Sequence, residues 1–78
     1  MYSTLSVVNN SRQVISVNID NEALFCDILP GESTNRKPVL IGTRCAVIIN
    51  SRGKIAADFP FSVAKNSHTV LKICSKDY

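Results

Sequence analysis

Gln13-Val14-Ile15-Ser16-Val17-Asn18-Ile19 is the stretch of sequence that decides the fold. Apolar and polar residues alternate in it, which places Ile15, Val17 and Ile19 on one face of an extended chain and the intervening polar residues on the other. A period of two is typical of a strand that buries one face. The sequence therefore predicts a β-strand here, with its apolar face toward a core.

A partner strand follows and completes a hairpin. Asp20-Asn21-Glu22 provides the turn, because Asp and Asn side chains bond to nearby backbone and tolerate unusual φ angles. Residues 23–28 return as the second strand, until Pro30 and Gly31 end it. The predicted inward set of this strand is Leu24, Cys26 and Ile28.

The rest of the chain consists of further short apolar runs separated by turn residues. These runs cover residues 5–8, 34–40, 44–50, 54–59, 61–63 and 68–74. Pro38 makes the second of them an edge strand or an extended connection. Residues 44–50 are apolar on both faces in their middle, which suits a central strand, and Gly53 closes a hairpin after them. Pro60 is predicted to interrupt the return strand.

These runs predict one all-β domain over residues 1–78. Six to seven short strands joined by tight turns fit a small antiparallel β-sandwich, and the alternative is a small β-barrel. Residues 39–50 are long enough for a helix, but their β-branched content and Gly42 argue against one. A domain of this size buries only about 60–65% of its unfolded surface, so its stability margin is thin.

Charge and hydropathy limit where the chain can act. Nine Lys and Arg against six Asp and Glu give a formal charge of +3, and the basic residues are spread along the chain.

No apolar run approaches the roughly 20 residues of a membrane helix, so we expect no membrane span. The N-terminus lacks the basic and apolar regions of a signal peptide. We expect a cytoplasmic location if Met1 is the native start, and the cell surface if the chain is a fragment of a longer protein.

Three cysteines, Cys26, Cys45 and Cys74, all lie in apolar runs. An odd number cannot all pair within one chain. Free cysteine in such positions behaves as a small buried hydrophobe, so the sequence predicts reduced core thiols. One disulfide with one thiol is the alternative. The spacing does not match a metal-binding motif.

The residues that could carry chemistry form no catalytic constellation. His68 is the single histidine, and the sequence offers no evident nucleophile or acid to pair with it. Asp20 and Glu22 bracket a turn, and the glycines lie in separate turns, so neither set predicts an acid–base pair or a phosphate cradle. We expect no enzymatic activity, no cofactor and no metal.

The order of turn signals resembles a known group of domains. The signals are V-V-N-N-S at 7–11, I-D-N at 19–21, L-P-G at 29–31, I-G-T-R-C-A-V-I-I at 41–49 and V-A-K-N-S-H-T-V-L-K-I at 63–73. The chain resembles bacterial β-sandwich modules of unknown function with immunoglobulin-like or transthyretin-like topology, and is similar to PEGA-type surface domains. The resemblance implies a role in cohesion, display or binding and carries over no catalytic residue. The chain departs from such modules in its three cysteines and its lack of a tandem repeat.

The sequence therefore favours a non-enzymatic structural or protein-interaction module, with another protein or a second copy in a homodimer as partner. The alternative is a small basic barrel that binds single-stranded nucleic acid, with Phe59 and Phe61 stacking on bases. Val70 and Leu71 point to opposite faces of the last strand, so Val70 is a candidate for the dimer surface. The predicted interaction residues are Arg44, Arg52, Lys54, Phe59, Phe61 and Val70.

Overall fold

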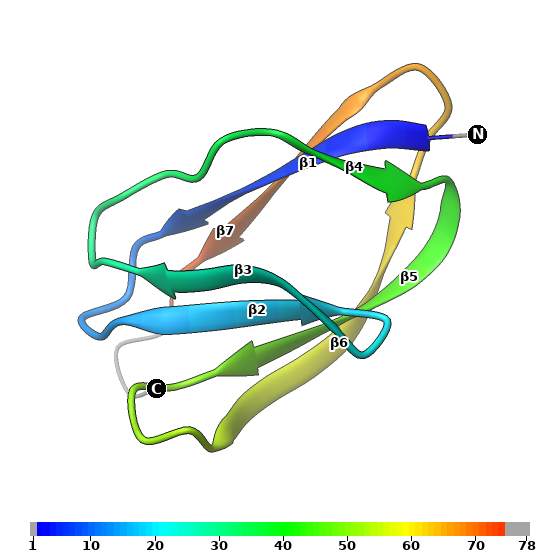
Figure 1. The fold of residues 1–78 in the computed structure, drawn as a ribbon. Helices are drawn as coiled ribbons and strands as arrows, with labels where there is room; N and C mark the ends of the chain where they lie inside the picture. The colour runs from blue at the N-terminus through cyan, green and yellow to red at the C-terminus, as the bar shows by residue number, and fades with distance from the viewer. Residues whose placement is uncertain (1, 75–78) are drawn as a thin grey trace.

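The computed structural model describes residues 2–74 and shows seven β-strands in two sheets (Figure 1). The strands are β1 (Tyr2–Asn9), β2 (Ile15–Ile19), β3 (Glu22–Ile28), β4 (Lys37–Leu40), β5 (Gly42–Ile49), β6 (Ile55–Val63) and β7 (His68–Ile73). The predicted small all-β sandwich is confirmed. The described residues include no helix long and apolar enough to cross a membrane.

One sheet has the order β4-β1-β7 and the other has the order β3-β2-β5-β6. The neighbouring strands are antiparallel except β1 and β7, which run parallel from Thr4–His68 to Asn9–Ile73. Parallel neighbours need a long connection, and here the connection includes the whole four-stranded sheet. The sandwich therefore departs at this one pair from the antiparallel pattern that the sequence predicts.

The positions of β4 and β6 within their sheets explain why each of these strands can contain a proline. β4 is a four-residue edge strand that contains Pro38, as the sequence predicts, and β5 is central in its sheet. Pro60 does not interrupt the return strand, because β6 runs continuously through it, opposite Cys45. β6 is an edge strand, where a residue without an N–H is tolerated. Gly53 has a φ of 77°, as its predicted place in the β5–β6 turn requires.

The core lies between the two sheets. Ile15, Val17 and Ile19 are buried, which confirms the predicted inward face of β2. They pack with apolar side chains from the other strands. The remaining buried apolar residues are Leu5, Val7, Phe25, Ile28, Val39, Ala46, Ile48, Val63, Leu71 and Ile73.

The predicted inward set of β3 is wrong at one position. Phe25 is buried and pairs with Val17, whereas Cys26 is exposed; Leu24 is partly buried and Ile28 is buried. The β2–β3 register shifts on both sides of Val17. A bulge of this kind breaks the strict alternation of side chains. A simple period of two therefore assigns the middle of β3 to the wrong faces.

The prediction of buried thiols is wrong for all three cysteines, since Cys26, Cys45 and Cys74 are free and exposed. The bulge turns Cys26 outward. Cys45 alternates with the buried Ala46 and therefore lies on the outer face of β5. Cys74 follows the last residue of β7. Apolar sequence neighbours did not predict burial because each strand has one outer face.

Candidate functional site

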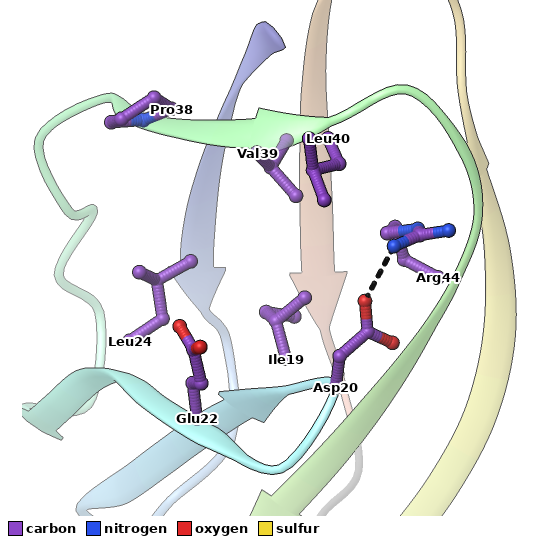
Figure 2. Close-up of a pocket in the computed structure, with 8 residues that line it drawn as sticks. All are labelled: Ile19, Asp20, Glu22, Leu24, Pro38, Val39, Leu40 and Arg44. Carbon is purple, nitrogen blue, oxygen red and sulfur yellow. Dashed lines mark hydrogen bonds and ion pairs between the residues drawn. The ribbon is translucent and has the colours of Figure 1, made fainter. Parts of the chain in front are cut away.

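A groove of about 340 Å³ opens between the two sheets at one end of the sandwich (Figure 2). The β2–β3 hairpin forms one wall, and β4 with the start of β5 forms the other. The residues that line it are Ile19, Asp20, Glu22, Leu24, Pro38, Val39, Leu40 and Arg44. The groove therefore combines residues from three separate parts of the sequence.

Chain topology keeps this end of the sandwich open. β4 ends at Leu40, and the chain then turns at Gly42, with a φ of 104°, to enter β5 in the other sheet. Ile19 is the last residue of β2, and the bulge of β3 leaves Leu24 only partly buried. Leu40 remains 44% exposed. These side chains face one another across the groove and give it apolar walls (Figure 2).

Asp20, in the β2–β3 turn, positions the Arg44 side chain in the groove. Asp20 has a φ of 50°, and its Oδ1 accepts a hydrogen bond from Cys45 N at 3.0 Å. Its Oδ2 accepts from Arg44 Nη1 at 2.9 Å, with the two side chains 40% and 26% exposed. Arg44 Nε is buried and has no hydrogen-bond acceptor in the described part of the chain. The guanidinium is therefore held in place on one side and remains partly unsatisfied.

The lining residues carry a net negative charge. Asp20 and Glu22 contribute two carboxylates and Arg44 contributes one guanidinium, which leaves one negative charge. Glu22 is exposed and forms no ion pair within residues 2–74. Because Asp20 is paired with Arg44, the exposed Glu22 carboxylate is the group of the groove that is available to a positively charged side chain with an apolar stem.

Lys37 borders the groove without lining it. Its Nζ donates to Leu24 O at 2.6 Å and lies 5.4 Å from the centre of the Phe25 ring. This lysine joins the edge strand β4 to the edge strand β3 across the gap between the sheets. The contact spans the two walls of the groove, since a backbone oxygen and a ring of β3 both approach the same ammonium group.

Basic residues gather at the opposite end of the sandwich. The turn between β5 and β6 carries Arg52 and Lys54, both exposed. Ser51 Oγ donates to Gln13 Oε1 at 3.1 Å, which brings this turn beside the β1–β2 turn and its exposed Arg12. Sequence reasoning missed Arg12 in this group, because the contact between the two turns exists only in the fold.

The structure does not bring the predicted interaction residues together. Arg44 lies in the groove, and Arg52 and Lys54 lie at the other end of β5. Phe59 and Phe61 are partly buried and pack against the core. Sequence reasoning missed the rest of the groove, since its other lining residues were assigned to turns, edges and core.

Val70 lies on the outer face of the three-stranded sheet, 43% exposed, whereas Leu71 is buried. The prediction that they point to opposite faces is confirmed. The register places Val70 beside Ser6, and the rows on either side of it are Thr4 with His68 and Val8 with Lys72. The neighbours of Val70 on this face are thus polar except the partly buried Val8, and so small an apolar surface is common on proteins.

His68 bridges two hydroxyl groups on the same outer face. Its Nδ1 lies 2.8 Å from Thr4 Oγ1 and its Nε2 lies 2.9 Å from Ser6 Oγ. A serine nucleophile needs access to substrate and a base oriented by a third group. Ser6 is only 8% exposed, so its hydroxyl is poorly placed for attack. The geometry instead indicates a structural contact that holds β7 against β1.

Two further observations concern ligands and relatives. The described residues contain no group of three or more His, Cys, Asp or Glu side chains that could hold a metal ion. Comparison of the chain with protein-family models, curated proteins and solved structures finds no match in any of the three. The interpretation of the groove therefore depends on its own geometry and charge.

Proposed function

We propose that the chain is a non-enzymatic protein-interaction module whose groove binds a basic, partly apolar segment of a partner protein. The observation that carries the proposal is the combination of apolar walls with a net negative lining. A lysine stem would pack on Leu24 and Leu40, and its ammonium would reach the Glu22 carboxylate. Such a site selects a positively charged side chain over a negatively charged one.

The size of the groove sets the expected strength of binding. About 340 Å³ accommodates one or two side chains, and small interfaces of this kind are typical of weak, transient contacts. The walls are already in place, because Lys37 joins β4 to β3 and Asp20 holds Arg44. Little conformational entropy is therefore lost when a segment enters.

The alternative function, binding of single-stranded nucleic acid, has weaker support. Arg12, Arg52 and Lys54 form a basic end that could contact phosphates. Base stacking needs exposed aromatic faces beside such residues, and Phe59 and Phe61 pack against the core instead. The immunoglobulin-like or transthyretin-like relationship, with its role in cohesion or display, is retained as part of the proposal.

Fluorescence anisotropy with two short peptides tests the proposed function. The first probe is a labelled peptide with one lysine between two isoleucines, and the second has glutamate in place of the lysine. At low salt we expect the lysine peptide to bind about tenfold more tightly. Glu22→Lys should weaken its binding about tenfold, whereas the matched control Glu32→Lys, outside the groove, should not.

Two results would overturn the proposal. Equal binding of both peptides would show that the groove does not select charge, and unchanged binding by Glu22→Lys would show that the peptide binds elsewhere. A labelled oligothymidylate provides the third arm. Tight, steeply salt-dependent binding of this strand that Lys54→Glu abolishes would favour the nucleic-acid alternative.

A further inference from the structure

We infer that the segment bound by the groove is the β5–β6 turn of a second copy of this chain, so that copies associate head to tail. The inference depends on the proposed function and names its partner. It is based on the chemical complementarity of two surfaces of the described chain. One is the groove, and the other is the turn that contains Arg52 and Lys54 with the neighbouring Ile55.

The turn has the chemistry that the groove selects. Ile55 is 67% exposed and is the most exposed large apolar side chain among the described residues. Arg52 and Lys54 precede it and are exposed. An apolar side chain beside two positive charges thus complements a groove with apolar walls and the exposed Glu22 carboxylate.

The turn is also organised by hydrogen bonds within it. Asn50 Oδ1 accepts hydrogen bonds from Arg52 N at 2.9 Å and Lys54 N at 3.1 Å. The backbone of Asn50 donates to Lys54 O at 2.9 Å and accepts from Gly53 N at 3.0 Å. Because these bonds fix the turn, its ordering costs little when it enters a groove.

The placement of the two surfaces decides the form of the assembly. Arg44 of the groove lies near the start of β5, and the turn follows the end of β5, so they lie at opposite ends of the molecule (Figure 1). A single copy cannot place its own turn in its own groove. Contact between two different surfaces leaves one groove and one turn free in every pair, so the assembly can extend further.

This arrangement differs from a symmetric dimer that forms through the outer face containing Val70. Such a dimer is what the sequence predicts, and it stays a separate prediction. The neighbours of Val70 on its face are Thr4, Ser6, His68 and Lys72, with only Val8 apolar. The groove and the turn offer both apolar and charged complementarity. Val70→Lys is therefore the matched control, since it adds a positive charge to the same molecule away from both surfaces.

Sedimentation velocity of the full chain, from micromolar to millimolar concentration at low salt, tests the inference. The unmodified chain should show a mean mass that rises beyond that of a dimer, and added salt should lower it. Leu40→Arg blocks the groove, and the double variant Lys54→Ser with Ile55→Ser removes the binding side chains of the turn. Each variant alone should stay monomeric, while Val70→Lys should associate like the unmodified chain.

Mixing the Leu40→Arg variant with the double variant of the turn tests the contact most directly. The Leu40→Arg chain keeps its turn and the double variant keeps its groove, so together they form one contact only. We expect a one-to-one complex that does not grow with concentration. Urea unfolding of each variant confirms that it is folded, and both altered sites are exposed.

The outcomes separate this inference from the proposed function. Association that survives both blocked variants, or that Val70→Lys abolishes, overturns the head-to-tail arrangement. A chain that stays monomeric at millimolar concentration, yet binds the lysine peptide in a way that Leu40→Arg prevents, overturns the self-association and leaves the proposed function standing. Absence of both self-association and peptide binding overturns both.

Discussion

Asn9 Nδ2 donates a hydrogen bond to Ile28 O at 2.8 Å and so joins the end of β1 in one sheet to the end of β3 in the other. Asn9 is fully buried. Its Nδ2 also donates to Gln13 O at 2.8 Å, and its Oδ1 accepts from Ser11 N at 2.9 Å and Ser11 Oγ at 2.6 Å. Both donors and both lone pairs of the amide are therefore used. This end of the sandwich is closed by side-chain bonds, whereas the other end holds the groove.

Replacement of Asn9 should be among the most damaging single changes in the described chain. Asn9→Leu keeps a side chain of similar shape but removes the donor to the buried Ile28 O and the part-buried Gln13 O, and also the acceptor for Ser11. We expect the free energy of unfolding to fall by about 3 kcal/mol in urea titration. Asn10→Leu, at the exposed neighbouring position, should change it by less than about 0.5 kcal/mol. Equal effects of the two variants would contradict a structural role for the buried amide.

The face assignment of β2 gives a second test. Val17 is fully buried between Phe25 and Ile48, so Val17→Ala should leave a cavity and cost on the order of 1–3 kcal/mol. Ser16 lies on the other face and its Oγ accepts one exposed hydrogen bond from Asp27 N. Ser16→Ala should therefore cost about 0.5 kcal/mol. A larger loss from Ser16→Ala in a denaturant titration would show that the faces are reversed.

Local sequence rules predicted the parts of the fold that local chemistry decides. Alternation from Ile15 to Ile19 identified the buried face of β2, and Asp20 and Asn21 adopt positive φ in the predicted turn. Gly53 does the same at the next hairpin. Each of these features is favoured by a few neighbouring residues, which is why local rules identify it.

Features that depend on distant contacts could not be predicted. The bulge that buries Phe25 and exposes Cys26 arises from the pairing of two strands, and Asp27 with a φ of 54° lies inside it. The groove brings the β2–β3 hairpin against β4, which follows it only after the loop between β3 and β4. Arg44 was predicted to interact, but the partner that positions it, Asp20, lies 24 residues away. A single sequence contains no signal for that proximity.

The thiols provide a third prediction, opposite to the one from sequence alone. Cys26, Cys45 and Cys74 are exposed and free, so a maleimide reagent should label all three in the native protein. The labelling rate of each cysteine should approach its rate in the urea-unfolded chain, as measured by mass spectrometry of the digested protein. Cys45→Ser should change the free energy of unfolding by less than about 0.5 kcal/mol. Slow labelling of Cys45 relative to the unfolded chain would place the outer face of β5 in a contact.

The His68 contact predicts a measurable coupling between β1 and β7. Ser6→Ala and His68→Ala each remove one partner of the same hydrogen bond. In a double-mutant cycle on urea unfolding, we expect a coupling energy of about 1 kcal/mol. The cycle of His68→Ala with Thr69→Ala, a residue outside this contact, serves as the control and should give about 0–0.5 kcal/mol. A coupling near zero for the first cycle would mean that the hydroxyl and the ring act independently.

Asp20 links the stability of the β2–β3 turn to the charge of the groove, so two substitutions there should separate the two effects. Asp20→Ala removes both accepted hydrogen bonds and places alanine at a φ of 50°. It should cost about 2 kcal/mol in urea titration.

Asp20→Asn keeps an oxygen for Cys45 N and a side chain that tolerates positive φ. Because the ion pair with Arg44 is solvent-exposed in part, its loss should cost only about 0.5 kcal/mol. The same variant removes the net negative charge of the groove lining, so binding of the lysine peptide should weaken severalfold while the fold is retained. A large loss of stability without a change in peptide affinity would mean that Asp20 serves the turn alone and that Glu22 by itself selects the charge.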